Sequence, residues 1–214
     1  MTTTPTTPDL AAAPLSAALR GGVFHYIRSL INGPRAVREV GAALAATPGE
    51  RVLDLGCGAG GLSTVVPGEY LGIDLNPGYL AFARWRFGAP HRRFELLELS
   101  DLEGRETFDK AIMASVLHHL TDEQALAVLA TLARIVRRRL VVLDLDPESA
   151  HGFQTFLIRH DRGKFPRPMA AQRALLARHF DVVAERRFAV TTRIAVHTLF
   201  TCESPSESPR EFPQ

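Results

Sequence analysis

A glycine-rich turn between two short apolar runs constrains this chain more than any other feature. The first run, 52–55, contains Asp54, and the second run ends at Asp74. Between them lie glycines at alternate positions, namely Gly56, Gly58 and Gly60. An apolar run followed by a glycine cluster predicts a buried strand and a tight turn, because glycine adopts positive φ and lets a ligand approach the backbone. Asp74 is placed to accept two hydrogen bonds from a ribose diol. The pattern therefore predicts a site for an adenosine-containing cofactor.

The glycines fit two cofactor patterns. With Gly61 as the third glycine the pattern is G-x-G-x-x-G, a dinucleotide signature, whereas Asp54 and Gly60 complete D-x-G-x-G-x-G. A dinucleotide site rests its pyrophosphate on the helix after the glycines, but only residues 62–66 precede Pro67, which is room for about a turn or two. Asp54 would repel a pyrophosphate and could hold a cationic ammonium group. These features favour S-adenosylmethionine, which carries an ammonium group and no phosphate.

Four segments, in order and spacing, resemble the class I S-adenosylmethionine-dependent methyltransferases. Residues 52–60 match the first motif of that family, 72–77 match the second, 108–120 resemble the fourth strand with its loop, and 140–144 resemble the fifth strand. The resemblance implies an α/β fold with a seven-stranded, mostly parallel, doubly wound (Rossmann-like) sheet, helices on both faces and a small helical lid. It also implies S-adenosyl-L-methionine as cofactor and S-adenosyl-L-homocysteine as product.

Composition predicts a single domain between two tails. At 214 residues with 46% hydrophobic content, one filled core is expected. Residues 1–14 and 204–214 are rich in Thr, Ser and Pro without apolar periodicity, which predicts disorder. The domain should occupy residues 15–203. Within it, we expect lid helices over 15–47 and a substrate lid insertion over 147–178.

Local signals place several elements. Pro34 favours the first turn of a helix, and Thr121 with Gln124 forms a capping box for another. The helix after Thr121 is expected to bury one set of apolar residues, namely Leu126, Leu129, Ala130 and Ala133. Residues 137–139, three arginines, are expected to form an exposed turn after it. The runs 180–188 and 195–202 predict two closing strands, and the resemblance makes the last one antiparallel.

The family motifs imply which residues hold the cofactor. They are Asp54, Gly56, Cys57, Gly58, Gly60, Asp74, Leu75, Glu98, Leu99 and Ala114. The third motif departs from the family, because the usual Gly-Asp is replaced by Leu97-Glu98. Glu98 then takes the place of the acid that bonds the adenine amino group, and Leu99 offers its backbone N–H to the ring. Asp101 is the competing candidate for the acid.

Histidines and a basic segment are the candidates for the reacting end of the site. His119, in the loop after the fourth strand, is the candidate general base, because histidine titrates near neutral pH. Methyl transfer often needs no base, since the sulfonium donor is already activated and positioning supplies much of the acceleration. The substrate pocket is expected to include His25, Tyr26, His118, His160 and Arg162. Arg162, Lys164 and Arg167 could hold an anionic group or could form a solvated basic loop.

The sequence favours methyl transfer to a small-molecule acceptor, because the chain is barely larger than a catalytic core. A nucleic-acid methyltransferase and a protein that keeps the cofactor only structurally are the alternatives. A net charge of +2 does not indicate a nucleic-acid or membrane partner. Two cysteines and the lack of a leader or long apolar run predict a cytoplasmic protein. No metal site is expected, and the oligomeric state and the methylated atom (O, N or C) stay open.

Overall fold

A computed structural model describes residues 15–149, 165–189 and 196–205. The strands are β1 (Arg51–Leu55), β2 (Glu69–Ile73), β3 (Arg92–Glu95), β4 (Phe108–Ala114), β5 (Val136–Leu145), β6 (Asp181–Ala189) and β7 (Val196–Glu203). The helices are α1 (Leu15–Leu44), α2 (Pro77–Phe87), α3 (Asp122–Ile135) and α5 (Met169–Leu176). Short 3₁₀ turns are η1 (Gly61–Val65), η2 (Leu99–Leu102), η3 (Leu117–His119) and η4 (Pro147–Ser149). The predicted tail 1–14 and most of the second tail, 206–214, lie outside the described residues.

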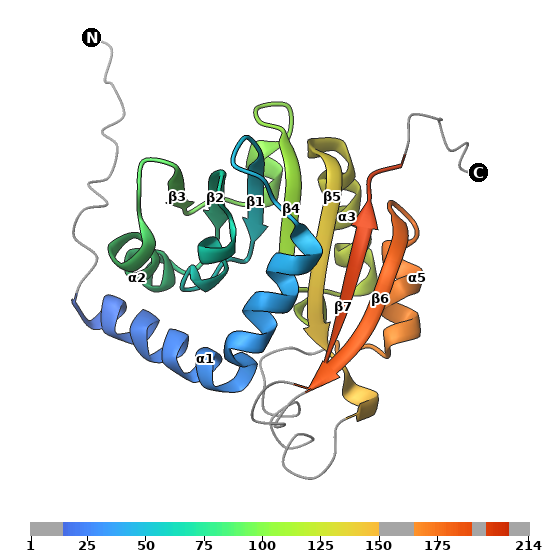
Figure 1. Cartoon of the computed structure of the whole chain (residues 1–214), viewed down its shortest axis with the longest axis horizontal. Coiled ribbons are helices and arrows are strands. Elements are labelled where there is room, and N and C mark those ends of the chain that lie inside the picture. The colour runs from blue at the N-terminus through green and yellow to red at the C-terminus, as the bar shows by residue number, and fades with distance from the viewer. Residues whose placement is uncertain (1–14, 150–164, 190–195, 206–214) are drawn as a thin grey trace.

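The strands form one sheet in the order β3-β2-β1-β4-β5-β7-β6 (Figure 1). The first five strands pair in parallel, and β7 runs antiparallel to both β5 and β6. The seven-stranded, mostly parallel, doubly wound sheet and the antiparallel last strand are confirmed. Because parallel strands run in the same direction, their carboxyl ends lie at one edge of the sheet. The turns after β1, β2 and β4 therefore meet at this edge, which is where α/β sheets bind ligands.

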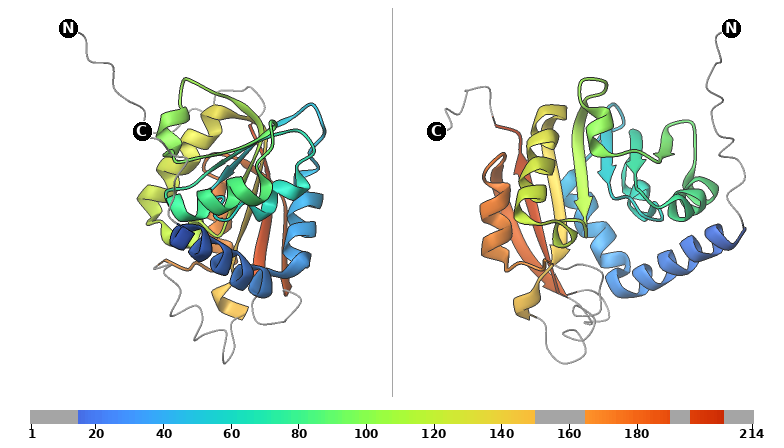
Figure 2. Two further views of the ribbon diagram at one scale, coloured as in Figure 1. Left: turned by 90° about the vertical axis from the view of Figure 1, so that its left-hand side faces the viewer. Right: turned by 180° about the vertical axis from the view of Figure 1, so that it is seen from behind.

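Helices cover both faces of the sheet, as Figure 2 shows from the side and from behind. The second half of α1 and α2 cover one face, where Val40, Leu44 and Leu80 are fully buried. On the other face α3 and α5 bury Leu129 and Leu176. The range predicted as a substrate lid, 147–178, therefore includes a helix, α5, that packs on the sheet; residues 150–164 lie outside the described part.

Helix α1 is bent into two halves. The bend is at Gly33, where φ is 63°, directly before Pro34. The second half lies on the sheet, and the first half runs past the carboxyl ends of the parallel strands beneath α2 (Figures 1 and 2). The crossing is close, because a Cβ on Gly21 would lie 2.6 Å from the carbonyl oxygen of Gly78 and 2.8 Å from Cβ of Phe82. The sequence predicts helical structure here, and in the structure this helix contacts α2 through Gly21.

Helix α3 and strand β5 differ from the expectation in detail. The capping box is present: Gln124 N–H donates to the Thr121 hydroxyl, and Thr121 N–H donates to the Gln124 side chain. The buried face is Ala125, Leu129, Leu132 and Ile135, so of the expected set only Leu129 is fully buried. The predicted turn at 137–139 is wrong, because β5 starts at Val136 directly after α3. Exposed arginines suit both a turn and the outer end of a strand, so composition alone misassigned them.

At the amino end of the sheet, buried charged side chains connect β4 to the segment that follows α1. Lys110 Nζ lies 2.9 Å from a carboxylate oxygen of Glu50 and donates to the carbonyl of Ala45 at 2.6 Å. Glu50 also pairs with Arg138 at 2.6 Å. Desolvation alone would raise the pKa of Glu50, but hydrogen bonds from Lys110 and the Thr47 N–H outweigh it and hold that pKa below its ordinary value.

Candidate functional site

The backbone conformation of the turn after β1 requires glycine at three positions. Gly56, Gly58 and Gly60 have φ of 70°, 54° and 79°, a region that other L-residues rarely adopt. A Cβ on Gly60 would lie 2.7 Å from the ring of Phe94. The N–H groups of Gly56 and its neighbour Cys57 both donate to the carbonyl of Ile73, at 2.9 and 3.0 Å. The turn is therefore fixed against the end of β2.

Asp74 connects this turn to the end of β2. One carboxylate oxygen accepts the Gly58 N–H and the other accepts the Asn76 N–H, both at 2.8 Å. Each carboxylate oxygen has two acceptor positions, so Asp74 keeps the capacity to accept a diol as well. The next residue, Leu75, is 68% exposed, which leaves an apolar side chain at the rim of the turn.

Asp54 lies under the turn with only 1% of its surface exposed. Its carboxylate accepts the hydroxyl of Tyr70, which lies on β2, at 2.7 Å. Burial, followed by the charge of Asp54, raises the pKa of Tyr70 well above its ordinary value, so the phenol stays a donor. Burial and the carboxylates of Asp54 and Asp74 likewise raise the pKa of the Cys57 thiol, which keeps it neutral. A Cβ on Gly72 would lie 2.8 Å from the Cys57 sulfur, so this strand position also needs glycine.

The third candidate segment lies after β3. Glu98 is exposed, and Leu99 starts η2 with its side chain in the core. The Asp101 carboxylate accepts the Glu98 N–H at 2.9 Å, so it stabilises the local turn. The Glu98 side chain in turn accepts the backbone N–H of Asp101, so the two acids form a capping box at the start of η2. The choice between Glu98 and Asp101 as the acid that binds adenine stays a prediction.

The end of β4 brings the cofactor turn and the histidines together. Ala114 is buried, and Ser115 has φ of 57° and donates its N–H to the carbonyl of Leu143 at 2.7 Å. A Cβ on Gly56 would lie 2.6 Å from Cγ2 of Val116, so the loop after β4 lies directly on the glycine turn. The two histidines follow this loop in η3.

The two histidines have different surroundings. His118 is 4% exposed, and its Nδ1 lies 2.5 Å from the carboxylate of Asp144 at the end of β5. His119 is exposed, with its ring centroid 4.2 Å from that of His118. Asp144 is therefore a carboxylate partner of His118, while the role predicted for His119 stays a prediction.

The other predicted pocket residues are less defined. His160 and Arg162 lie outside the described residues, and His25 and Tyr26 lie in α1 at positions where only the backbone is described. Arg167 is buried and donates to the carbonyls of Leu117 and Leu120 at 2.9 and 2.7 Å. It therefore stabilises η3 and does not form part of a solvated basic loop.

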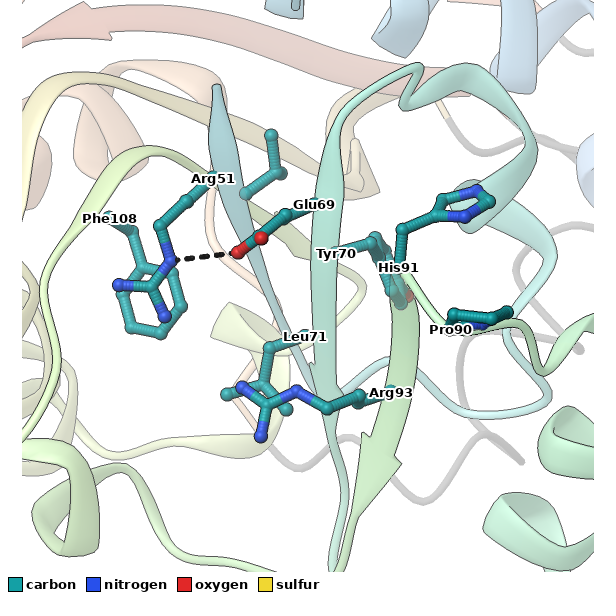
Figure 3. A pocket seen from close by; sticks show the side chains of 9 residues that line it. Arg51, Glu69, Tyr70, Leu71, Pro90, His91, Arg93 and Phe108 are labelled. Carbon is teal, nitrogen blue, oxygen red and sulfur yellow. Dashed lines mark hydrogen bonds and ion pairs between the residues drawn. The ribbon is translucent and has the colours of Figure 1, made fainter. Parts of the chain in front are cut away.

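A small pocket lies at the opposite end of the sheet, at the amino ends of β1 and β2 (Figure 3). Its volume is about 70 Å³, and it is lined by Arg51, Val52, Glu69, Tyr70, Leu71, Pro90, His91, Arg93 and Phe108. Its charges are already paired, since Arg51 contacts Glu69 at 3.2 Å and Glu106 at 2.6 Å. The carboxyl edge of the sheet, with its positive-φ turn and its acids, is therefore the candidate functional site.

Sequence reasoning missed Tyr70 and Asp144. Tyr70 sits in an apolar strand run and gave no separate signal. Asp144 did give one, because it is the next-to-last residue of the apolar run of β5, as Asp54 is of β1, and Asp74 directly follows β2. Three acids at strand ends along one sheet edge mark the site more fully than the glycines alone.

Comparison with known proteins agrees with this geometry. Residues 52–139 match the family model described as a methyltransferase domain. The chain is 34% identical over 124 residues to O-methyltransferase cnsE of Penicillium expansum, a match that covers 53% of this chain and 44% of that protein. It is 35% identical over 101 residues to the ubiquinone biosynthesis O-methyltransferase of Hahella chejuensis, covering 44% and 41%. The chain thus spans less than half the length of these curated relatives.

A solved structure extends the likeness to most of the fold. The N-methyltransferase NodS of Bradyrhizobium japonicum, in complex with S-adenosyl-L-homocysteine, matches with a TM-score of 0.64 at 16% identity, over 80% of this chain and 85% of that one. The fold and the glycine turn define the class I, Rossmann-like methyltransferase architecture. Over residues 52–139 the chain matches a methyltransferase domain, and its fold is that of a methyltransferase solved with S-adenosyl-L-homocysteine, the product form of S-adenosylmethionine.

The residues present fit this cofactor. The turn keeps the backbone clear of side chains where a ligand would lie, Asp74 suits a ribose diol, and the acid under the turn suits an ammonium group. When bound, the cofactor supplies an electrophilic methyl group. Among the described residues no group of His, Cys, Asp and Glu is arranged to hold a metal ion, and none of the described helices could span a membrane.

Proposed function

We propose that this protein transfers a methyl group from S-adenosylmethionine to a hydroxyl oxygen of a small molecule of secondary metabolism. The observation that carries the proposal is that both curated relatives are O-methyltransferases. Their matches extend beyond the general fold to 34% and 35% identity. The net charge of +2 agrees with a small-molecule acceptor better than with a nucleic acid. Both cysteines are free thiols, which suits a cytoplasmic location.

Each cofactor residue has a proposed role. Asp74 binds the ribose diol, Asp54 stabilises the ammonium end, and Glu98 with the Leu99 N–H binds adenine. The turn at 56–60 carries the methionine part. The loop after β4, with His118 and His119, faces the methyl group and the acceptor, and α1 covers the cofactor with His25 and Tyr26. The segment that contains His160 and Arg162 completes the acceptor pocket.

Two measurements test the proposal. Isothermal titration should show binding of S-adenosylmethionine and S-adenosylhomocysteine and no binding of NAD or NADP. Incubating the protein with a methyl-labelled donor and a metabolite extract should then label a small molecule at oxygen. Binding of NAD without binding of S-adenosylmethionine would contradict the cofactor assignment. Label found only in nucleic acid would contradict the acceptor class.

A further inference from the structure

His118 and Asp144 form a pair that the cofactor site does not require. One oxygen of Asp144 lies 2.5 Å from Nδ1 of His118, and the other accepts the backbone N–H of the same residue at 3.1 Å. Both side chains are buried, with 5% and 1% exposure. A single carboxylate thus fixes both the position of the His118 backbone and the orientation of its ring.

The loop that carries His118 is fixed from outside as well. The Arg167 guanidinium donates to the carbonyls of Leu117 and Leu120, on either side of the histidines. The same guanidinium pairs with Asp122 at 2.6 Å. The contact with Asp144 and the two anchored sides of the loop leave the planar imidazole ring of His118 little rotational freedom, because a turn about its side-chain bonds would break the Asp144 contact.

The location of the pair connects it to methyl transfer. Val116, two residues before His118, is the side chain that a Cβ on Gly56 would meet at 2.6 Å. The loop after β4 therefore lies directly on the turn that would carry the methionine part of the cofactor. Asp144 ends β5, the next strand of the sheet, so the pair lies at the same carboxyl edge.

A purely structural reading explains the pair poorly. A buried carboxylate paired with a histidine is weak evidence for added stability, because both groups lose their hydration on burial. The oriented pair does have a chemical consequence. A carboxylate at Nδ1 stabilises the tautomer that carries its proton there, so that Nε2 has the lone pair.

We propose that His118 is the proton acceptor of this methyltransferase and that Asp144 is its positioning residue, so that the acceptor is a hydroxyl that is protonated at neutral pH. This inference rests on the proposed function. The acceptor oxygen forms a bond to the methyl carbon as the carbon–sulfur bond breaks, and the electron pair of that bond goes to sulfur. The hydroxyl proton passes to Nε2 of His118, and the resulting imidazolium is stabilised by Asp144 until the proton leaves to solvent.

The tautomer can be measured without any substrate. Nitrogen NMR of the labelled, cofactor-free protein should show the neutral His118 ring protonated at Nδ1 and not at Nε2. In Asp144→Asn this preference should be lost. The opposite tautomer in the wild-type protein would overturn the proposal whatever the variants do.

Two acceptors of different acidity test the chemistry. Catechol is protonated near neutral pH, whereas 4-nitrophenol is largely ionised at about pH 8 and needs no base. His118→Gln should lower the rate of methyl transfer to catechol by about 10²–10⁴-fold, the typical contribution of a general base, and change transfer to 4-nitrophenol by less than tenfold. Asp144→Asn should show the same selective loss. His91→Gln, an exposed histidine at the amino end of the sheet, is the matched control and should affect neither.

The outcomes separate this inference from the proposed function. S-adenosylhomocysteine affinity and the melting temperature show which variants fold. If His118→Gln does not fold, the rates of Asp144→Asn on the two phenols test the proposal instead. Equal rates for His118→Gln and wild type on catechol, or a larger loss in His119→Gln than in His118→Gln, would overturn the role of His118 alone. Wild-type protein that binds S-adenosylhomocysteine but methylates neither phenol would contradict hydroxyl methylation itself.

Discussion

Asp74 has a structural task and a proposed binding task. Its carboxylate accepts the N–H of Gly58 and of Asn76, which fixes the glycine turn to the start of α2, and the proposed function adds a ribose diol to these partners. Asp74→Ala should weaken binding of S-adenosylhomocysteine by about 1.5–3 kcal/mol, the typical value for hydrogen bonds to a charged group. Titration calorimetry measures this. The control is Asp109→Ala, because Asp109 also accepts a backbone N–H, from Arg51 at 2.9 Å, but lies at the amino end. If Asp74→Ala and Asp109→Ala bind S-adenosylhomocysteine with the same affinity, Asp74 does not bind the ribose.

Tyr70 stabilises the buried carboxylate of Asp54 under the glycine turn. Its hydroxyl donates to Asp54 at 2.7 Å, and its ring packs on Phe94 with centroids 5.4 Å apart. Tyr70→Phe keeps the ring but removes a donor from a buried carboxylate, which should lower the free energy of unfolding by about 1–3 kcal/mol. Urea unfolding followed by circular dichroism measures the change. A variant as stable as wild type would show that the hydroxyl contributes nothing to holding Asp54.

At the scale of elements, the crossing of α1 and α2 decides how the first half of α1 is held over the cofactor edge. Alanine normally favours a helix over glycine by about 1 kcal/mol. Gly21→Ala should nevertheless separate the two helices, because the added Cβ would meet backbone of Gly78 at 2.6 Å. We expect faster amide hydrogen exchange in the first half of α1 and several-fold weaker binding of S-adenosylhomocysteine.

The control for this element is Gly49→Ala. An added Cβ at Gly49 has nothing within 4 Å, so this variant should match wild type in exchange and affinity. Unchanged exchange in Gly21→Ala would mean that the crossing shifts without cost and does not fix the helix.

Sequence patterns predicted the elements whose signals are local. The glycine turn, the capping box at Thr121 and the two closing strands are each encoded by a few adjacent residues, and the structure contains all of them. Pairings between distant segments had no such signal. Asp144 and His118 are 26 residues apart, and no local pattern indicates that an acid of β5 contacts a histidine of η3. For the same reason the sequence did not indicate that Asp144 contacts His118, and it favoured His119 as the base.

At the scale of the whole molecule, the two ends of the sheet have separate tasks. The carboxyl edge carries the cofactor turn, whereas at the amino end Glu50 joins Lys110, Arg138 and the N–H of Thr47. Stability and function should therefore respond to different substitutions. Variants at Glu50 should change unfolding while the cofactor site of the folded molecules stays intact.

Glu50 gives this separation a pH dependence. Its pKa is lower in the folded protein than its ordinary value of 4.5, so its contribution to stability is complete above that value and is lost as the pH falls through the folded pKa. Glu50→Gln should lower the free energy of unfolding at neutral pH by about 3 kcal/mol, because it leaves Lys110 buried without its carboxylate. The difference from wild type should narrow below about pH 4.5. Unfolding measured across that range checks this, and a constant difference would contradict it.

The glycine turn is held by the protein's own backbone, through the carbonyl of Ile73 and the carboxylate of Asp74. Its conformational entropy is therefore lost when the chain folds and not when a ligand arrives, so little of the contact energy is spent on ordering the site. Cofactor affinity then becomes sensitive to any substitution that loosens the pairing of β1 with β2, even one far from every cofactor atom.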